Sequence, residues 1–261
     1  MITYMHEAFI AEAIEGVLMQ TCDYEVELII ADDCSTDKTG ILIKQYIDTH
    51  PKGYWIKYTR HKQNKGMIPN FSWALQQAKG KYIALCEGDD YWLDSDELKN
   101  QLEFLTANPV YSFVCNDILH INQNGSGRQD RWPGISSELK INLRLLGEEY
   151  PVATNTLMLR GDFLPKVLTK LSRVEHTKIL GDYFLISLLL TQGPGYYFPK
   201  KVSAYRYHEN SNFSSNSIKD KVYRGLLTRK ILLKSFAMHM QWGYVIIIIK
   251  NYLKFKKRFL E

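Results

Sequence analysis

The chain has 261 residues, of which 45% are apolar and 23% are charged, as in an ordinary globular protein. These values argue against a disordered, collagen-like or repeat protein. Its four cysteines form no C-x-x-C pair and have no regular spacing, which argues against a disulfide framework or a zinc site and favours reduced thiols in a cytosolic setting.

The net charge of +5 is unevenly distributed along the chain. From Val222 to Glu261 there are nine Lys or Arg residues and one acidic residue, so this segment carries +8 and residues 1–221 carry −3. The basic residues are interleaved with apolar ones, including the run Trp242–Ile249, a mixture that favours an anionic membrane surface over nucleic acid. The run is too short to span a bilayer. The alternative is a helix that packs on the body with solvated lysines.

Short strand-like runs alternate with helical stretches, so we expect an α/β fold with a mostly parallel central sheet flanked by helices. In chain order the sequence predicts a helix over 7–20, a strand over 25–31, a helix over 38–49, a strand over 55–59, a helix over 69–78, a strand over 81–86, a helix over 98–107 and a strand over 112–116. The polar, glycine-rich segment 122–134 predicts a loop or a boundary between two halves.

Beyond that boundary the sequence predicts a strand over 154–160, helices over 163–171 and 182–190, short strands over 195–198 and 202–206, and a helical tail from about residue 219. At the other end only Met1–Thr3 remain for a first strand, which is short for the centre of a sheet. This indicates a stub or, the interpretation that we favour, missing upstream residues. We expect no signal peptide, because His6, Glu7 and Glu12 interrupt the first apolar residues.

Acidic residues follow two of the predicted strands. Asp32-Asp33 ends one strand, and Glu87-Gly88-Asp89-Asp90 follows another about 55 residues later. Because ligands bind beyond the carboxyl ends of parallel strands, we expect both groups to border one cleft. Such a cluster of carboxylates suits a divalent cation that carries a diphosphate, and Gly88 allows close approach of the backbone to a ligand. The alternative is that each acidic pair only caps a helix.

Three stretches together resemble the family 2 glycosyltransferases, which are inverting, nucleotide-sugar-dependent enzymes with a Rossmann-like GT-A fold. They are Ile2-Thr3-Tyr4 followed by His6–Ile10, the segment ADDCSTDKT (Ala31–Thr39) and the segment NKGMIPNFSWALQQAKGKYIALCEGDDYW (Asn64–Trp92). The resemblance implies a nucleotide-sugar-binding half at 1–120 and an acceptor-binding half of the same GT-A domain at 121–218. We expect residues 219–261 to form a basic amphipathic helical tail.

The resemblance also implies roles for individual residues. Asp89, the last acid of a D-x-D motif, would ligate Mn²⁺ or Mg²⁺ that bridges the diphosphate, and Glu87 would lie toward the ribose next to Gly88. The base and ribose, commonly of a uridine nucleotide, would be bound by Thr3, Tyr4, Asp32 and Asp33. The chain departs from the family pattern in having Met5 where Asn is common and Glu87 at the start of the D-x-D motif.

Inversion at the anomeric carbon requires a general base on the acceptor hydroxyl, across the cleft from the metal. The segment LGDYFLISLL (Leu180–Leu189) resembles the family's E-D-x-x-L segment and implies that Asp182 is this base, with Gly181 in place of the usual Glu. The alternative is that Asp182 caps the following helix. The segment YRYHENSNFS (Tyr205–Ser214) resembles a Y-R-x-H-x-x-S element, in which Arg206 would contact phosphate and His208 would be a further metal or diphosphate ligand or a structural residue.

We therefore expect a metal-dependent inverting glycosyltransferase of polysaccharide biosynthesis that transfers a hexosyl or N-acetylhexosaminyl group, most simply from a UDP-sugar. The acceptor would be a hydroxyl of a cell-surface glycan or of a lipid-linked molecule at the inner face of the cell membrane, with no nucleic-acid partner. A phosphoryl-transfer enzyme is a rival, but no Lys stands at a suitable strand end. A second rival is a catalytically impaired, transferase-derived glycan-binding or scaffolding protein, which Glu87 and Gly181 favour and which Asp89 and Asp182 oppose.

Overall fold

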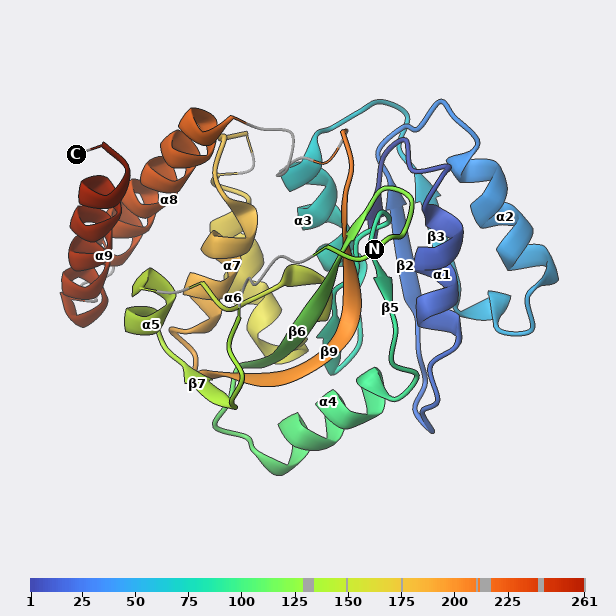
Figure 1. Cartoon of the computed structure of the whole chain (residues 1–261), viewed down its shortest axis with the longest axis horizontal. Helices are drawn as coiled ribbons and strands as arrows, with labels where there is room; N and C mark the ends of the chain where they lie inside the picture. Colours follow the sequence, from blue (N-terminus) through green and yellow to red (C-terminus); the bar gives the residue numbers. More distant parts are fainter. Residues whose placement is uncertain are drawn as a thin grey trace.

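The computed structural model describes residues 1–128, 134–148, 150–174, 176–209, 211, 217–238 and 242–260, with the side chains of 147, 148, 238 and 258–260 excepted. Part of the expected loop at 122–134 and part of the YRYHENSNFS segment, namely 129–133, 210 and 212–214, lie outside the described residues. Within the described ranges the fold is α/β, with helices on both sides of the strands (Figure 1).

The first sheet is parallel and has the order β1-β2-β3, formed by Ile2–Thr3, Leu28–Asp32 and Ile56–Arg60. The helices α1 (Ile10–Leu18) and α2 (Thr39–Thr49) pack on it through fully buried isoleucines, among them Ile14, Ile30 and Ile43. β1 is as short as the sequence indicates. Whether further residues precede it stays a prediction.

The second sheet is mixed and has the order β4-β8-β6-β9-β5, with β7 pairing with β9. Its strands are β4 (Tyr82–Ala84), β5 (Tyr91–Trp92), β6 (Phe113–Asn122), β7 (Leu139–Ile141), β8 (Met158–Arg160) and β9 (Gly195–Tyr207). β6 and β9 are parallel, whereas β4–β8, β6–β8, β5–β9 and β7–β9 are antiparallel. The α/β class is thus confirmed, but the described strands form two sheets in place of one mostly parallel sheet, and four of the five pairings in the second sheet are antiparallel.

β9 has 13 residues and combines the two short strands that the sequence predicts. Its register against β6 shifts on both sides of Asp117, which explains why the two apolar runs read as separate strands. The strand runs the length of the sheet and ends beside the loop that follows β4. It thereby carries Arg206 and His208 back to the acidic cluster in the first half of the chain.

The largest apolar core lies between the second sheet and the helices of the second half. Its fully buried members include Phe113 on β6, Leu159 on β8, Phe184 on α7 and Tyr197 on β9. The remaining elements are α3 (Met67–Gln77), α4 (Glu97–Ala107), α5 (Leu143–Glu148), α6 (Leu164–Leu171) and α7 (Gly181–Leu189), with short 3₁₀ turns at Gly53–Trp55, Thr154–Thr156 and Gly161–Phe163.

The C-terminal helices α8 (Ile218–Met238) and α9 (Trp242–Leu260) form the outermost layer on one side of the molecule (Figure 1). They belong to the largest core, because Leu232, Phe236 and Ile248 are fully buried in it. The Asn251 side-chain amide on α9 also donates a hydrogen bond to the Leu143 carbonyl on α5 (3.0 Å). Among the described helices, none is long and apolar enough to cross a lipid bilayer.

Candidate active site

The loop after β4 packs closely against the loop after β1. The Gly88 N–H donates a hydrogen bond to the Ile2 carbonyl (2.9 Å). A Cβ atom at position 88 would lie 2.7 Å from Thr3 Oγ1 and 2.8 Å from Thr3 Cβ, closer than such atoms approach, and 3.0 Å from His6 Nδ1. Glycine is therefore required here for the two loops to meet. Thr3 is buried, and its hydroxyl lies 3.2 Å from His6 Nδ1.

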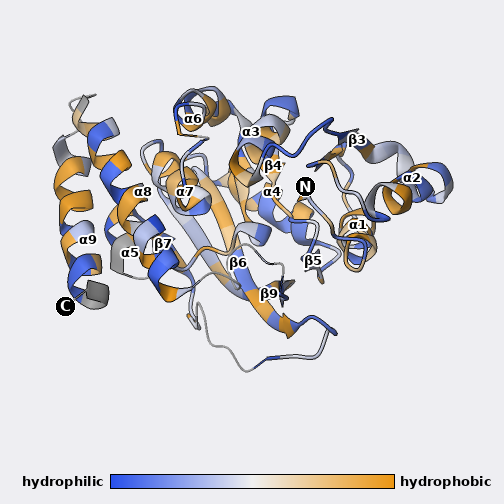
Figure 2. Ribbon diagram, turned by 90° about the horizontal axis from the view of Figure 1, so that it is seen from above, coloured by the Kyte–Doolittle hydropathy of each residue, from blue (hydrophilic) through white to orange (hydrophobic). Residues whose placement is uncertain are grey.

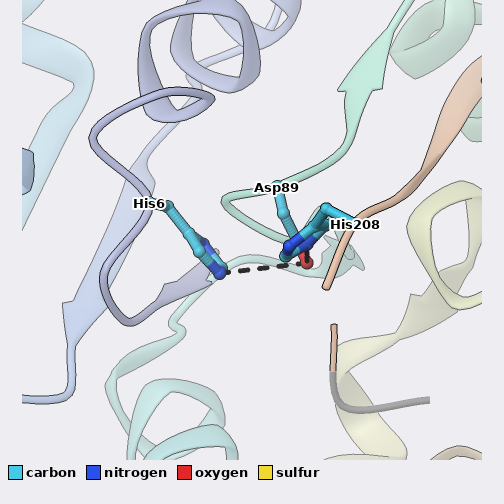
Figure 3. Close-up of side chains that lie close together, drawn as sticks. All are labelled: His6, Asp89 and His208. Carbon is cyan, nitrogen blue, oxygen red and sulfur yellow. Dashed lines mark hydrogen bonds and ion pairs between the residues drawn. The ribbon is translucent and has the colours of Figure 1, made fainter. Parts of the chain in front are cut away.

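Asp89 lies between two histidines from distant parts of the chain (Figure 3). Its Oδ2 is 2.9 Å from Nε2 of His208 and 3.8 Å from Nε2 of His6. The three potential ligand atoms lie within 4.8 Å of one another, and the Asp89 side chain is 19% exposed. A carboxylate and two imidazoles so placed can bind a divalent cation from one side and leave positions open for a ligand's oxygens.

The protonation states in this cluster suit metal binding. Burial lowers the pKa of His6, so the imidazole is neutral and available as a ligand near neutral pH. At Asp89 burial favours the neutral acid, but the hydrogen bond with His208, followed by the electrostatic influence of the two imidazole rings, outweighs burial and holds the pKa of this carboxyl below its usual value. The residues present therefore fit a divalent cation.

The other two carboxylates of the acidic cluster have different environments. Burial, followed by the charge of Asp89, raises the pKa of Glu87 to about 8, and its Oε2 has no hydrogen-bond partner among the residues that the structure describes. Asp90 is buried, and its Oδ1 accepts a hydrogen bond from the Arg206 N–H (2.8 Å). Asp89 thus faces the histidines, Asp90 anchors β9 and Glu87 is a half-buried acid with one unpartnered, inward-facing oxygen.

Arg206 holds the loop after β4 in place. Its Nε donates to the Asp89 carbonyl (3.1 Å), its Nη1 donates to the Gln123 carbonyl (3.0 Å) and its Nη2 forms an ion pair with Glu12 on α1. The residue is 3% exposed, and its guanidinium lies 4.9 Å from the centre of the Phe9 ring. The predicted contact with phosphate stays a prediction; the structure places these donors on protein oxygens.

The two acids at the end of β2 are buried and bonded to neighbouring loops. Asp32 accepts hydrogen bonds from the Ser35 N–H and the Tyr58 hydroxyl (both 2.8 Å). Asp33 accepts hydrogen bonds from the backbone N–H groups of residues 65 and 66 (2.7 and 2.9 Å). Tyr4, by contrast, is 48% exposed at the mouth of these loops. Nucleotide contacts by Thr3, Tyr4, Asp32 and Asp33 stay predictions.

The departure from the family pattern at position 5 has a conformational consequence. Met5 has a φ of 57°, in the left-handed region that Asn enters more readily than Met. Its N–H donates to the Ser35 hydroxyl (2.9 Å), which ties the loop after β1 to the loop after β2. The tight turn brings the following residue, His6, back toward Asp89.

Asp182 lies in the first turn of α7, where the positive end of the helix dipole favours its anion. Its Oδ2 accepts a hydrogen bond from the Tyr150 hydroxyl (2.9 Å). Burial raises the pKa of Asp182, while this bond and a backbone N–H oppose the rise. Asp182 is near enough to Glu87 that its charge contributes to the raised pKa of Glu87. The predicted base therefore lies within electrostatic range of the acidic loop, and its role as the base stays a prediction.

The start of α7 is positioned by two contacts with neighbouring helices. The N–H of Leu180, which precedes the helix, donates to the Thr228 hydroxyl on α8 (2.8 Å). A Cβ atom at Gly181 would lie 2.5 Å from Ile68 Cδ1 on α3. The glycine that replaces the usual Glu is thus a packing residue between α3 and α7.

Sequence reasoning missed three residues of this site: His6, Tyr150 and Glu12. His6 stands two residues beyond Tyr4, a residue that the family motif includes. Its position just after the first strand, whose end was expected to border the cleft, is the signal that could have identified it. Tyr150 and Glu12 have no local signal, because their partners are 32 and 194 residues away. An open depression lined by residues 122–124, Arg128 and Tyr207–Glu209 borders the site at His208.

The sequence profile described as glycosyl transferase family 2 matches residues 1–164. An uncharacterized protein of Mycobacterium tuberculosis, Rv1520, is 33% identical over 159 residues, which are 61% of this chain and 45% of that protein. The minor teichoic acid biosynthesis protein GgaB of Bacillus subtilis is 27% identical over 214 residues, which are 81% of this chain and 23% of GgaB. The chain thus spans less than half the length of either relative.

Solved structures share the fold. S. aureus TarS 1-349 in complex with UDP-GlcNAc has a TM-score of 0.67 and 20% identity, over 89% of this chain and 65% of that one. The mannosyltransferase PcManGT from Pyrobaculum calidifontis, in complex with GDP-Man and Mn²⁺, has a TM-score of 0.60 and 16% identity, over 96% of this chain and 67% of that one. The arrangement is that of a GT-A fold, and the family profile covers more than half of the residues. The chain belongs to glycosyl transferase family 2.

Proposed function

We propose that this chain is a metal-dependent inverting glycosyltransferase that transfers a sugar from a UDP-sugar to an acceptor hydroxyl. The observation that carries the proposal is the His6–Asp89–His208 cluster at the carboxyl ends of β1 and β4, with Asp182 near the same acidic loop. Two structural neighbours support it in general terms, since TarS is seen with UDP-GlcNAc and PcManGT with GDP-Man and Mn²⁺.

The donor set favours one of the two candidate cations. Mg²⁺ binds almost entirely through oxygen ligands and gives up its waters reluctantly, whereas Mn²⁺, which also prefers oxygen, belongs to the transition-metal series and accepts imidazole nitrogen more readily. We therefore expect Mn²⁺ to bind more tightly than Mg²⁺ to His6, Asp89 and His208. When bound, the cation would neutralise charge on the leaving diphosphate.

The protein's own part in the reaction is proton transfer and positioning. Asp182, as a carboxylate, would accept the proton of the acceptor hydroxyl, whose oxygen then bonds to the anomeric carbon while the bond to the nucleotide diphosphate breaks. The Tyr150 hydroxyl would hold the Asp182 carboxylate in orientation through the bond to Oδ2. Arg206 and Asp90 would keep the loop that bears Asp89 fixed against α1 and β9.

For the acceptor we propose a cell-surface glycan or a lipid-linked glycan presented at the inner face of the cell membrane. The relative GgaB is named as a minor teichoic acid biosynthesis protein, which supports a glycan acceptor. The nine Lys and Arg residues beyond Val222 lie on α8 and α9, which pack beside the Asp182-bearing α7. A positive flank of this kind suits an acceptor that is held at an anionic surface.

The test is the melting temperature with UDP or GDP, each with Mn²⁺ or with a chelator, for wild type, Asp89→Asn and His6→Ala. Because a ligand that binds the native state stabilises it by mass action, we expect a Mn²⁺-dependent rise with UDP. Asp89→Asn should abolish the rise and His6→Ala should reduce it. His50→Ala, on the remote end of α2, is the matched histidine control and should leave it intact. No rise with either nucleotide in wild type would contradict the proposed donor site.

A further inference from the structure

The outward face of α9 carries four large apolar side chains in contact with solvent. Trp242, Ile246, Ile249 and Leu253 are 59%, 54%, 42% and 57% exposed. Their spacing of four, three and four residues places them in a single stripe along the helix. We call this set the α9 stripe. Soluble surfaces rarely gather apolar residues in this way without a contact to make.

The stripe is separate from the contacts that hold α9 on the molecule. The opposite side of the helix buries Val245, Ile248 and Asn251 against the body, through the largest core and the hydrogen bond to Leu143. The apolar run Val245–Ile249 therefore contributes to both sides of the helix. Val245 and Ile248 pack inward, whereas Ile246 and Ile249 face the solvent. Figure 2 shows both apolar and polar residues along α9 at the outer edge of the molecule.

Lysines border the stripe. Lys250, Lys254, Lys256 and Lys257 are exposed on the same helix, and no acidic residue occurs between Trp242 and Leu260. A tryptophan at one end, a row of aliphatic side chains and flanking lysines are the composition of a helix that lies in a membrane interface. We propose that the α9 stripe is a docking surface for an anionic phospholipid membrane, with α9 parallel to its plane.

Charge favours this occupant over a second copy of the chain. A two-fold contact through the α9 stripe would bring the lysine rows of both copies together, and like charges across a contact are costly. An anionic lipid surface, by contrast, attracts the same lysines. Each lysine near the surface then raises the affinity for the membrane about fivefold. The apolar side chains then enter the boundary between head groups and acyl chains.

Membrane docking by α9 extends the proposed function. It rests on that function only for one point, namely that the acceptor is held at a membrane. α9 packs on α8, and α8 supplies the Thr228 hydroxyl that holds the residue before the Asp182-bearing helix. A membrane in contact with the α9 stripe would thus lie on the acceptor side of the site, away from α2 at the far end of the molecule (Figure 1).

The test is sedimentation of the full chain with vesicles of phosphatidylcholine alone or of an equal mixture of phosphatidylcholine and phosphatidylglycerol. We expect wild type to bind the anionic vesicles, and Ile246→Ser/Ile249→Ser/Leu253→Ser to bind about tenfold or more weakly. Lys250→Gln/Lys254→Gln should lose about fivefold for each lysine on anionic vesicles only. The matched control is Ile41→Ser/Tyr54→Ser/Val110→Ser, three residues that are 67%, 72% and 60% exposed elsewhere, and it should bind as wild type does.

Three results would overturn the inference: no binding of wild type to anionic vesicles, equal loss in the control variant, or a wild-type dimer that the stripe substitutions convert to a monomer. The last result would assign the stripe to a second copy. Because all substituted side chains are exposed, melting temperatures should stay near that of wild type. The UDP-dependent rise in melting temperature, measured on the same variants, should be unchanged, so that failure of membrane binding and failure of the donor site are distinguishable.

Discussion

At the scale of single residues, the three neighbouring carboxylates after β4 have three separate environments. Asp89 is paired with histidines, Asp90 accepts a hydrogen bond from a backbone N–H of β9, and Glu87 is half-buried with a pKa raised to about 8. Three charges within four residues would repel one another strongly in a buried place. Protonation of Glu87 near neutral pH relieves that repulsion, and a divalent cation at Asp89 would relieve it further.

The Tyr150 hydroxyl provides a test of Asp182 as the base. The reaction needs the carboxylate form, so activity should fall as the pH falls through the pKa of Asp182. Tyr150 donates to Oδ2 and thereby lowers that pKa. In Tyr150→Phe we expect the acid limb of the kcat/KM profile to move to higher pH, because the carboxylate loses a donor. Asp182→Asn should lower kcat by about 10²–10⁴-fold.

The control for this measurement is Tyr82→Phe, which removes a hydroxyl that contacts Thr106 on α4 instead of the site. Its pH profile should match that of wild type. An unchanged acid limb in Tyr150→Phe, with an intact UDP-dependent rise in melting temperature, would show that Asp182 is not the titrating base.

At the scale of elements, the junction of α3 and α7 explains Gly181. A Cβ atom there would lie 2.5 Å from Ile68 Cδ1. We expect Gly181→Glu, which introduces the residue common in the family, to destabilise the protein by about 1–3 kcal/mol through overpacking. Ile68→Val removes only Cδ1 and should cost about 0.5–1.5 kcal/mol alone. The double variant should be more stable than the sum of the two losses predicts, because Ile68→Val makes room for the new side chain. Denaturant unfolding of wild type, both single variants and the double variant would measure this difference. Strict additivity would refute the contact as the cause.

Elements with strong local patterns were predictable from the sequence, and those made by distant pairing were not. The helices α1, α2 and α4 lie within one to three residues of the predicted bounds, because their apolar spacing is helical. β5 and β7 have two and three residues and exist through pairing with β9, which is more than 50 residues away. The same reason applies to the site: the motifs indicated Asp89, Asp182 and His208, whereas the place of Tyr150 depends on tertiary packing alone.

At the scale of the whole molecule, α8 and α9 join the C-terminal part of the chain to the predicted base. Thr228 on α8 bonds to Leu180, and the Arg229 guanidinium lies 4.3 Å from the centre of the Tyr183 ring and 4.1 Å from that of Phe255 on α9. Tyr183 in turn stacks on Tyr150, with ring centres 5.9 Å apart. Contacts therefore run without a gap from α9 to the hydroxyl that orients Asp182. The basic tail expected from the sequence is also part of the packing around the site.

This arrangement predicts that removal of the residues after Val222 disrupts the fold. The deletion takes away Leu232, Phe236, Val245 and Ile248, each no more than 7% exposed. At about 1.5–3 kcal/mol for each buried side chain, the loss of about 6–12 kcal/mol is comparable with the entire stability of a typical domain. We expect the shortened chain to be insoluble or to lack a cooperative melting transition. A shortened chain that melts cooperatively and retains the UDP-dependent rise in melting temperature would refute this structural role. In that case we would expect the deletion to remove membrane binding alone.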